Sequence, residues 1–232
     1  MKNIRLEDRL IFALDVPEVV DAKEIVSELD DSVNFYKIGM EMLMTGQYFE
    51  LLDWLIRQDK KVFVDLKFFD VPETVGRTIA RLSDYGATFA TIHGNQALME
   101  KAAANKGNLK ILAVTALTSL DRGDLDDLGF TCNVKDLVIS RAKRAFEAGC
   151  DGIVSSGLEV PFIREYVDDK LISLQTLLNL CSSTVTFKYA ISIIPPLDDR
   201  CRLLQIPSRS VLHNKYLHFQ HYGTLPQLPP LL

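Results

Sequence analysis

The chain has 232 residues, which suits one globular domain with a sizeable core. Hydrophobic residues make up 47% of it and charged residues 25%, and the formal net charge of -5 gives no overall attraction to nucleic acid or to an anionic membrane. The N-terminal sequence MKNIRLEDRL lacks the apolar run of a signal peptide. The four cysteines show no CxxC pair, which predicts reduced thiols in a cytoplasmic protein and argues against a disulfide framework or a zinc site.

The composition changes near residue 172. Residues 1–171 contain 29 acidic and 21 basic residues, a net of -8, whereas residues 172–232 contain 2 acidic and 5 basic residues, a net of +3. Six of the nine prolines also fall in the second segment. We therefore expect a barrel domain over residues 1–171 and a separate tail over residues 172–232.

Before this boundary, short apolar runs alternate with amphipathic stretches. The runs are rich in Val, Ile, Phe and Leu, as expected for strands that are buried on both faces of a parallel sheet. In chain order, the predicted strands are Arg9–Asp15, Val33–Gly39, Lys61–Lys67, Ala87–His93, Leu109–Leu117 and Gly152–Ser155. The stretches between them predict helices over Glu18–Leu29, Glu41–Gln58, Glu73–Tyr85, Gln96–Asn105 and Val134–Ala148.

Six successive βα units fit either a doubly wound sheet or a TIM-type (β/α)8 barrel. Polar residues fall at or just past the ends of the predicted strands, where barrel enzymes build their sites. These residues are Asp15, Lys37, Asp65, Lys67, His93 and Thr118. No G-x-G-x-x-G turn follows the first strand, as a dinucleotide-binding sheet would require. The sequence therefore predicts an α/β fold of the TIM-barrel type.

The stretch Lys61–Val75, KVFVDLKFFDVPETV, carries the most chemistry. Side chains alternate between the faces of a strand, so Asp65 and Lys67 are expected to point the same way, with Asp70 on the loop that follows. An ordinary surface ion pair is the simpler interpretation, but the run around Asp65 is otherwise apolar, and charges directed inward are costly without a purpose. An acid–base–acid series at a barrel mouth suits proton donation to a carbanion beside a negatively charged substrate group.

The pattern D-x-K-x-x-D-[IV]-P-x-T-V resembles the signature of the orotidine 5'-phosphate decarboxylase family. Four further segments resemble family motifs in the same order: ALDVP at residues 13–17, YKIG at 36–39, TIHG at 91–94 and VTALTSL at 114–120. The resemblance runs from about Leu6 to Leu171. It implies a (β/α)8 barrel that acts as a homodimer with active sites shared between subunits, on orotidine 5'-phosphate and without a cofactor or metal.

The resemblance also implies roles for individual residues. Asp15 and Lys37 would contact the ribose hydroxyls, and Asp65 and Lys67 would lie beside the reacting carboxylate, with Lys67 as the proton donor to C6. Asp70 and Thr74 would reach into the partner's site. The pocket side chains would be His93, Thr118 and Ser119, with Ser119 bonded to the pyrimidine.

Three of these residues also have a purely structural interpretation. His93 suits a satisfied core histidine, Thr74 suits the first turn of the helix after Pro72, and Ser119 suits a helix N-cap before Asp121. Magnesium-dependent sugar-phosphate lyases of the same superfamily share D-x-K-x-x-D, but they carry an acidic residue where this chain has Lys37.

The family pattern is not continued after Leu171. A seventh and an eighth strand should end in Gly-rich turns that bind the substrate phosphate, yet residues 172–222 contain no glycine. We therefore expect the last one or two βα units to be missing or replaced, the first and sixth strands to have open edges, and the tail to be out of frame or disordered. An inactive remnant that dimerises or binds nucleotide weakly is thus an alternative to the active decarboxylase.

Overall fold

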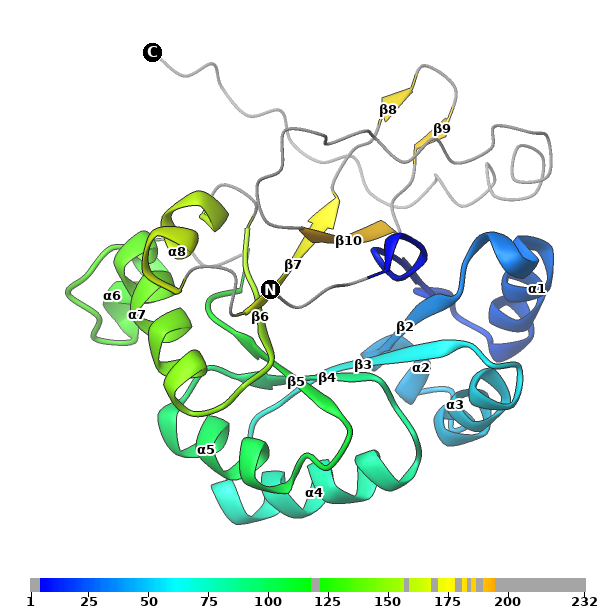
Figure 1. The fold of residues 1–232 in the computed structure, drawn as a ribbon, viewed down its shortest axis with the longest axis horizontal. Coiled ribbons are helices and arrows are strands. Elements are labelled where there is room, and N and C mark those ends of the chain that lie inside the picture. The colour runs from blue at the N-terminus through cyan, green and yellow to red at the C-terminus, as the bar shows by residue number, and fades with distance from the viewer. Residues whose placement is uncertain are drawn as a thin grey trace.

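The computed structural model describes residues 5–117, 122–156, 159–167, 171–177, 181–182, 185–186 and 190–194. Eight strands of this part form a closed barrel in the order β1-β10-β7-β6-β5-β4-β3-β2 (Figure 1). They are β1 (Leu10–Ala13), β2 (Phe35–Gly39), β3 (Lys61–Phe68), β4 (Phe89–His93), β5 (Lys110–Val114), β6 (Gly152–Val154), β7 (Ile172–Leu177) and β10 (Ala190–Ile194). The short strands β8 (Cys181–Ser182) and β9 (Val185–Thr186) form a separate antiparallel pair.

Helices cover the outside of the barrel (Figure 1). They are α1 (Val19–Leu29), α2 (Met40–Leu43), α3 (Tyr48–Arg57), α4 (Pro72–Asp84), α5 (Gln96–Asn105), α6 (Arg122–Asp127), α7 (Val134–Glu147) and α8 (Val160–Val167). Short 3-10 turns, η1 (Leu6–Asp8) and η2 (Asp30–Ser32), precede β1 and β2. None of the helices in the described ranges is long and apolar enough to cross a membrane.

The local sequence explains where several helices begin and end. Pro72 takes the first turn of α4, where its missing N–H costs nothing, and the Asn133 side chain caps α7 by accepting the Asp136 N–H at 2.8 Å. The helix predicted over Glu41–Gln58 is instead two helices. Gly46, with a φ of 76°, lies in the turn between α2 and α3, since only glycine adopts this conformation freely.

Two apolar layers hold the barrel together. An inner cluster fills its interior and consists of Ile11, Phe35, Phe63, Phe89, Leu112, Ile172 and Leu174. The ring centroids of Phe35 and Phe63 lie 5.0 and 6.1 Å from that of Phe89. A larger cluster packs the outward faces of the strands against the helices. The alternation of inward and outward side chains along each strand produces both layers.

The barrel closes through the segment that was expected to be a tail. Strands β1 to β7 are parallel, and β10 pairs antiparallel with both β7 and β1. The TIM-type barrel with a replaced final unit is therefore confirmed, but the expectation of open edges is wrong, because β6 pairs with β7 and β1 with β10. Leu177 lies opposite Ala190, so β10 starts at the end of the barrel where β7 stops, and no crossover is needed.

Candidate active site

Three neighbouring strands build a polar layer directly above the inner apolar cluster. Each strand places a phenylalanine in that cluster and a polar residue two positions later, which side-chain alternation brings to the same face. The pairs are Phe35 and Lys37 on β2, Phe63 and Asp65 on β3, and Phe89 and Thr91 on β4. The aromatic rings therefore form an apolar floor beneath the charged groups at the carboxyl ends of the strands.

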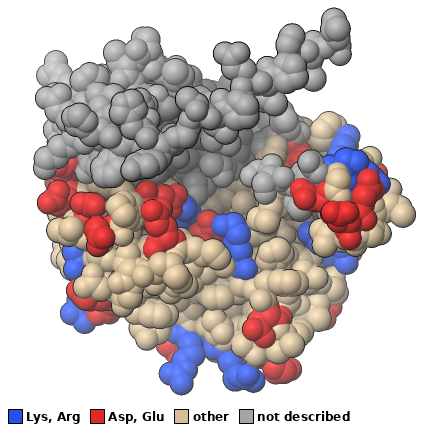
Figure 2. All heavy atoms as spheres, turned by 180° about the vertical axis from the view of Figure 1, so that it is seen from behind, with Lys and Arg blue, Asp and Glu red and all other residues tan. Residues whose placement is uncertain are grey.

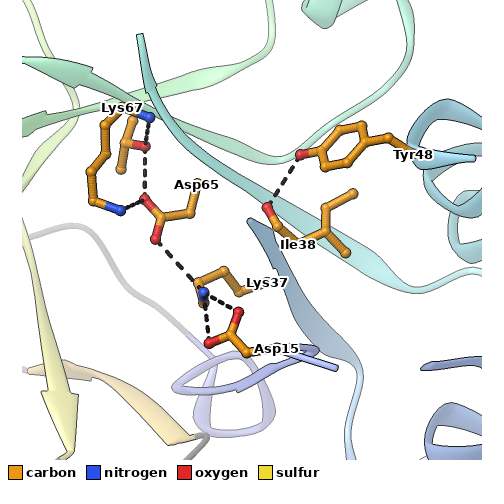
Figure 3. Close-up of polar contacts among 7 residues, drawn as sticks. Asp15, Lys37, Ile38, Tyr48, Asp65 and Lys67 are labelled. Carbon is orange, nitrogen blue, oxygen red and sulfur yellow. Dashed lines mark hydrogen bonds and ion pairs between the residues drawn. The ribbon is translucent and has the colours of Figure 1, made fainter. Parts of the chain in front are cut away.

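The charged side chains form a continuous series of alternating sign (Figure 3). Lys37 Nζ lies 2.8 and 3.1 Å from the two carboxylate oxygens of Asp15 and 3.8 Å from Asp65 Oδ2. Lys67 Nζ donates to Asp65 Oδ1 at 3.0 Å. Each step in the order Asp15, Lys37, Asp65 and Lys67 therefore joins opposite charges.

The centre of the series is buried and its two ends are open to solvent. The side chains of Lys37 and Asp65 are 10% and 14% exposed, whereas those of Asp15 and Lys67 are each 38% exposed. Buried charges are tolerated only when they are paired, and Lys37 and Asp65 each contact two groups of opposite charge. The site therefore presents one carboxylate and one ammonium to the barrel mouth on a rigid charged base.

Strand β3 is irregular where it carries Asp65 and Lys67. Between Val64 and Phe68 the register advances four positions on β3 but only two on β4, from Ala90 to Ile92. Lys67, within this bulge, has a φ of 46°. Strand alternation correctly predicts that Asp65 and Lys67 lie together, but for the wrong reason, because a bulge and a left-handed residue bring the Lys67 side chain back to Asp65.

Thr91 is a component of the site that the sequence interpretation omitted. It is fully buried, its hydroxyl donates to Asp65 Oδ1 at 2.9 Å, and its Oγ1 accepts the Lys67 N–H at 2.9 Å. A signal for it exists in the sequence. The three-residue pattern Phe-x-Thr on β4 matches the pattern Phe-x-Lys on β2 and Phe-x-Asp on β3.

Asp70 and Thr74 lie next to the charged series but outside it. Asp70 is exposed on the loop between β3 and α4, where its Oδ1 accepts the Val71 N–H at 2.6 Å. Thr74 lies in the first turn of α4, and its Oγ1 accepts a bond of 3.4 Å from Arg77.

His93 ends β4 at the barrel mouth. Its ring lies 4.6 Å from that of Phe69 between centroids. Burial lowers the pKa of His93, and the nearby charges of Arg141 and Lys67 lower it further. Burial likewise lowers the pKa of Arg141, whose guanidinium donates to the Thr115 carbonyl at 2.6 Å. His93 is therefore a neutral ring on the wall of the site at neutral pH.

Glycines keep backbone and side chains close at two of these strand ends. A Cβ on Gly39 would lie 3.4 Å from Lys37 Nζ and 3.6 Å from Asp15 Oδ1, so a larger side chain there would enter the charged site. A Cβ on Gly94 would lie 2.7 Å from the Val114 carbonyl oxygen, which no ordinary side chain allows. Both glycines belong to motifs that the sequence singled out, YKIG and TIHG.

Two of the predicted site residues, Thr118 and Ser119, lie outside the described residues. Among the residues that the structure does describe, no three His, Cys, Asp or Glu side chains gather as metal ligands would. Cys132 and Cys150 are free thiols. On the face seen in Figure 2, acidic and basic side chains are interspersed.

Known proteins resemble this chain over most of its length. A family model for the orotidine 5'-phosphate decarboxylase / HUMPS family matches residues 8–186. The orotidine 5'-phosphate decarboxylase of Methylococcus capsulatus is 63% identical over 171 residues, which are 74% of this chain and 71% of the relative. That of Stenotrophomonas maltophilia is 53% identical over 163 residues, 69% of this chain and 68% of the relative.

A solved structure agrees with both. The crystal structure of orotidine 5'-phosphate decarboxylase from Lactobacillus acidophilus has a TM-score of 0.67 and 32% sequence identity, and the similarity covers 72% of this chain and 80% of that one. The family match also continues past residue 171 and includes β7. By its sequence, its barrel and the motifs at its strand ends, the chain belongs to the orotidine 5'-phosphate decarboxylase / HUMPS family.

Proposed function

We propose that this chain converts orotidine 5'-monophosphate to UMP and CO2 without a cofactor. The observation that carries the proposal is the buried series of alternating charges at the barrel mouth, which ends in the Lys67 ammonium bonded to Asp65 at 3.0 Å. The substrate offers a carboxylate on C6 of a pyrimidine, and the reaction needs a proton donor beside that carbon.

The reaction requires one bond to break and one proton to move. The bond between C6 and the carboxylate breaks, CO2 leaves, and the electron pair stays on C6. Lys67 Nζ then donates a proton to C6, and the neutral amine regains a proton from water. Asp65 would repel the substrate carboxylate in the ground state, and this repulsion disappears as CO2 departs. Lys37 helps to hold the Asp65 carboxylate in place, since its Nζ lies 3.8 Å from Asp65 Oδ2.

The remaining roles concern binding. Asp15 and Lys37 would bind the ribose hydroxyls, because Asp15 lies at a solvent-exposed end of the series and Lys37 is bonded to it at 2.8 Å. His93 would line the pocket as a neutral ring, and Thr118 and Ser119 would contact the pyrimidine. Binding energy from such remote contacts contributes to the chemical step when it is realised in the transition state.

We propose further that two chains form a homodimer in which Asp70 and Thr74 complete the partner's site. Exposed apolar side chains around Asp70 support this surface as an interface. Phe69 and Val71 flank it and are 65% and 62% exposed. A cytoplasmic location is part of the same proposal, supported by the free thiols of Cys132 and Cys150 in the described part of the chain.

The position of Lys37 favours this reaction over that of a magnesium-dependent sugar-phosphate lyase. Its ammonium lies between the carboxylates of Asp15 and Asp65, at 2.8 and 3.8 Å, which is where a cation shared by the two acids would lie. A divalent ion at that place would meet a fixed positive charge. Turnover of orotidylate that is insensitive to EDTA is therefore expected.

The deciding experiment follows the loss of orotidylate absorbance on addition of the purified protein, with and without EDTA, beside the Lys67→Ala variant. We expect turnover in both buffers and a fall in kcat of at least about a thousandfold in the variant, because the proton donor is gone. Turnover by Lys67→Ala at the rate of the unaltered chain would contradict the assigned role. Turnover only with added Mg2+ would favour the lyase.

The direction of β10 favours a second candidate, a remnant that binds nucleotide weakly and does not turn it over. Barrel enzymes often bind phosphate with the loops that follow strands seven and eight at the mouth. Here the strand in the eighth place is antiparallel, so Ala190 lies at the mouth and Ile194 at the opposite end. The carboxyl end of β10 therefore lies at the end of the barrel opposite the site, unlike the eighth strand of a parallel barrel.

Thermal unfolding with UMP separates this remnant from a misfolded chain, because a ligand that binds only the native state raises the melting temperature. Stabilisation by UMP without turnover of orotidylate would support the remnant. We also propose that the unmatched end of the chain arose by a change of reading frame, and an uninterrupted family ending is then expected one or two nucleotides out of frame in the gene. Absence of such an ending would refute that origin.

A further inference from the structure

We propose that Thr91 is a positioning residue for the decarboxylation, holding Asp65 and the Lys67 backbone in their reactive arrangement through one hydroxyl group. The inference rests on the proposed function for its kinetic consequence but not for its structural one. Thr91 lies on β4 between Phe89 of the apolar floor and His93 at the mouth, directly beside the bulge of β3.

A single oxygen makes both contacts. Thr91 donates its hydroxyl proton to Asp65 Oδ1 at 2.9 Å, and its lone pair accepts the Lys67 N–H at 2.9 Å. A hydroxyl is the smallest side-chain group that donates and accepts at once. The side chain is fully buried, so water does not compete for either bond. Thr91 thereby couples the carboxylate of one reacting residue to the backbone of the other.

The bulge explains why the backbone of Lys67 needs this partner. Register between β3 and β4 is kept at Val64 and again at Phe68, so the residues between them leave the regular ladder. A backbone N–H inside a protein needs an acceptor, and Thr91 Oγ1 supplies it for Lys67. Lys67 also has a φ of 46°, a conformation that its surroundings must hold against the extended alternative.

The second bond fixes the direction of the Asp65 carboxylate. Its Oδ1 receives both the Thr91 hydroxyl at 2.9 Å and Lys67 Nζ at 3.0 Å, while Oδ2 faces Lys37 at 3.8 Å. Without the hydroxyl, this carboxylate is free to turn toward Lys37, and Lys67 Nζ loses its fixed distance from the reacting carbon. Misplacement of a reacting group by about 1 Å is enough to lower the rate about a hundredfold.

The test compares Thr91→Val, which keeps the shape and removes the hydroxyl, with Thr91→Ser, which keeps the hydroxyl. Thr115→Val is the matched control, because Thr115 is also fully buried and its hydroxyl donates only to the Val154 carbonyl, at 3.0 Å. We expect Thr91→Val to lower kcat by about 10- to 100-fold with KM within about threefold, and Thr91→Ser to restore kcat to within about threefold of the unaltered chain. The control should change neither constant by more than about threefold.

Two kinetic results would overturn the inference. One is a folded Thr91→Val variant whose kcat stays within threefold of the unaltered chain. The other is a Thr91→Ser variant as slow as Thr91→Val, which would assign the effect to packing of the methyl group. A purely structural threonine predicts a lower stability with unchanged kcat, and the split between kcat and KM separates the two roles.

A second measurement tests the positioning role of Thr91 without relying on catalysis. If the unaltered chain does not convert orotidylate, the proposed function fails, but this measurement still tests whether Thr91 holds the Lys67 backbone. Amide hydrogen exchange of Lys67, followed by NMR, reports its bond to Thr91. We expect exchange at least about tenfold faster in Thr91→Val than in the unaltered chain, and little change in Thr91→Ser. Equal exchange in all three proteins would show that the hydroxyl does not hold this backbone.

Discussion

Lys67 has a backbone conformation that glycine would adopt more easily. We therefore predict that glycine at this position gives a more stable protein than alanine, whereas glycine within a strand usually lowers stability. We compare Lys67→Gly with Lys67→Ala, since both remove the ion pair to Asp65 and differ only in the Cβ. At a φ of 46° the Cβ costs about 1–2 kcal/mol. The unfolded chain gains about 0.5–1 kcal/mol of conformational entropy with glycine. The glycine variant should therefore be the more stable by about 0.5–1 kcal/mol.

The same pair of substitutions at Lys61 provides the control. Lys61 begins β3 in regular register with Phe35, and its ion pair with Asp8 is lost in both variants. Here the strand is extended, so Lys61→Gly should be less stable than Lys61→Ala by about 0.5–1 kcal/mol. The sign of the glycine-minus-alanine difference is thus opposite at the two ends of one strand.

Urea unfolding followed by fluorescence or circular dichroism measures both differences. With a urea m-value of about 2 kcal/mol/M, each corresponds to a shift of the midpoint of about 0.25–0.5 M. If Lys67→Gly unfolds at a lower urea concentration than Lys67→Ala, Lys67 does not store backbone strain in solution, and the bulge does not explain how it meets Asp65. Neither variant should decarboxylate orotidylate, so strain and proton donation are tested separately.

Two other properties of the site can be measured without substrate. The lowered pKa of His93 means that the unfolded chain takes up a proton below about pH 6.5 before the native state does, so stability should fall as the pH drops from 7 to about 5.5. His93→Gln should flatten this part of the pH–stability curve, and identical slopes would contradict the lowered pKa. Val71→Asp should convert a dimer to a folded monomer in light-scattering chromatography, whereas Val20→Asp, at a site that is 61% exposed on α1, should not. A monomeric unaltered chain would refute the proposed interface.

The sequence predicted those features that arise from local pattern. Apart from Glu41–Gln58, which forms two helices, the predicted strands and helices agree with the observed ones to within a few residues, because apolar runs and amphipathic stretches of this length leave little choice of element. The four charged residues Asp15, Lys37, Asp65 and Lys67 were also predicted to gather at one end of the barrel, and they form one series. The carboxyl ends of parallel strands all lie at one end of the barrel. A residue at the end of its strand can therefore be assigned to that end of the barrel from the sequence alone.

Features that depend on contacts between distant segments were not predicted. The bulge in β3 has no local signal, since Leu66 and Phe68 continue the apolar character of the strand, and it becomes necessary only against β4. The role of Thr91 depends on that bulge. Strand β10 was assigned to a tail because Ala190–Ile194 has no family pattern, and its direction is fixed only by pairing with β7 and β1.

The reversed strand β10 shows that many different sequences can supply the last strand of a barrel. Hydrogen bonds along a strand edge join backbone groups, so they place few demands on the identity of the side chains. Any extended segment with one apolar face can protect two exposed edges, and an antiparallel one needs no crossover helix. A barrel that closes in this way can therefore stay folded even when the sequence of its last strand has changed. In this chain β10 pairs with the edges of both β7 and β1, so the charged series at the ends of β1 to β3 lies on a closed barrel.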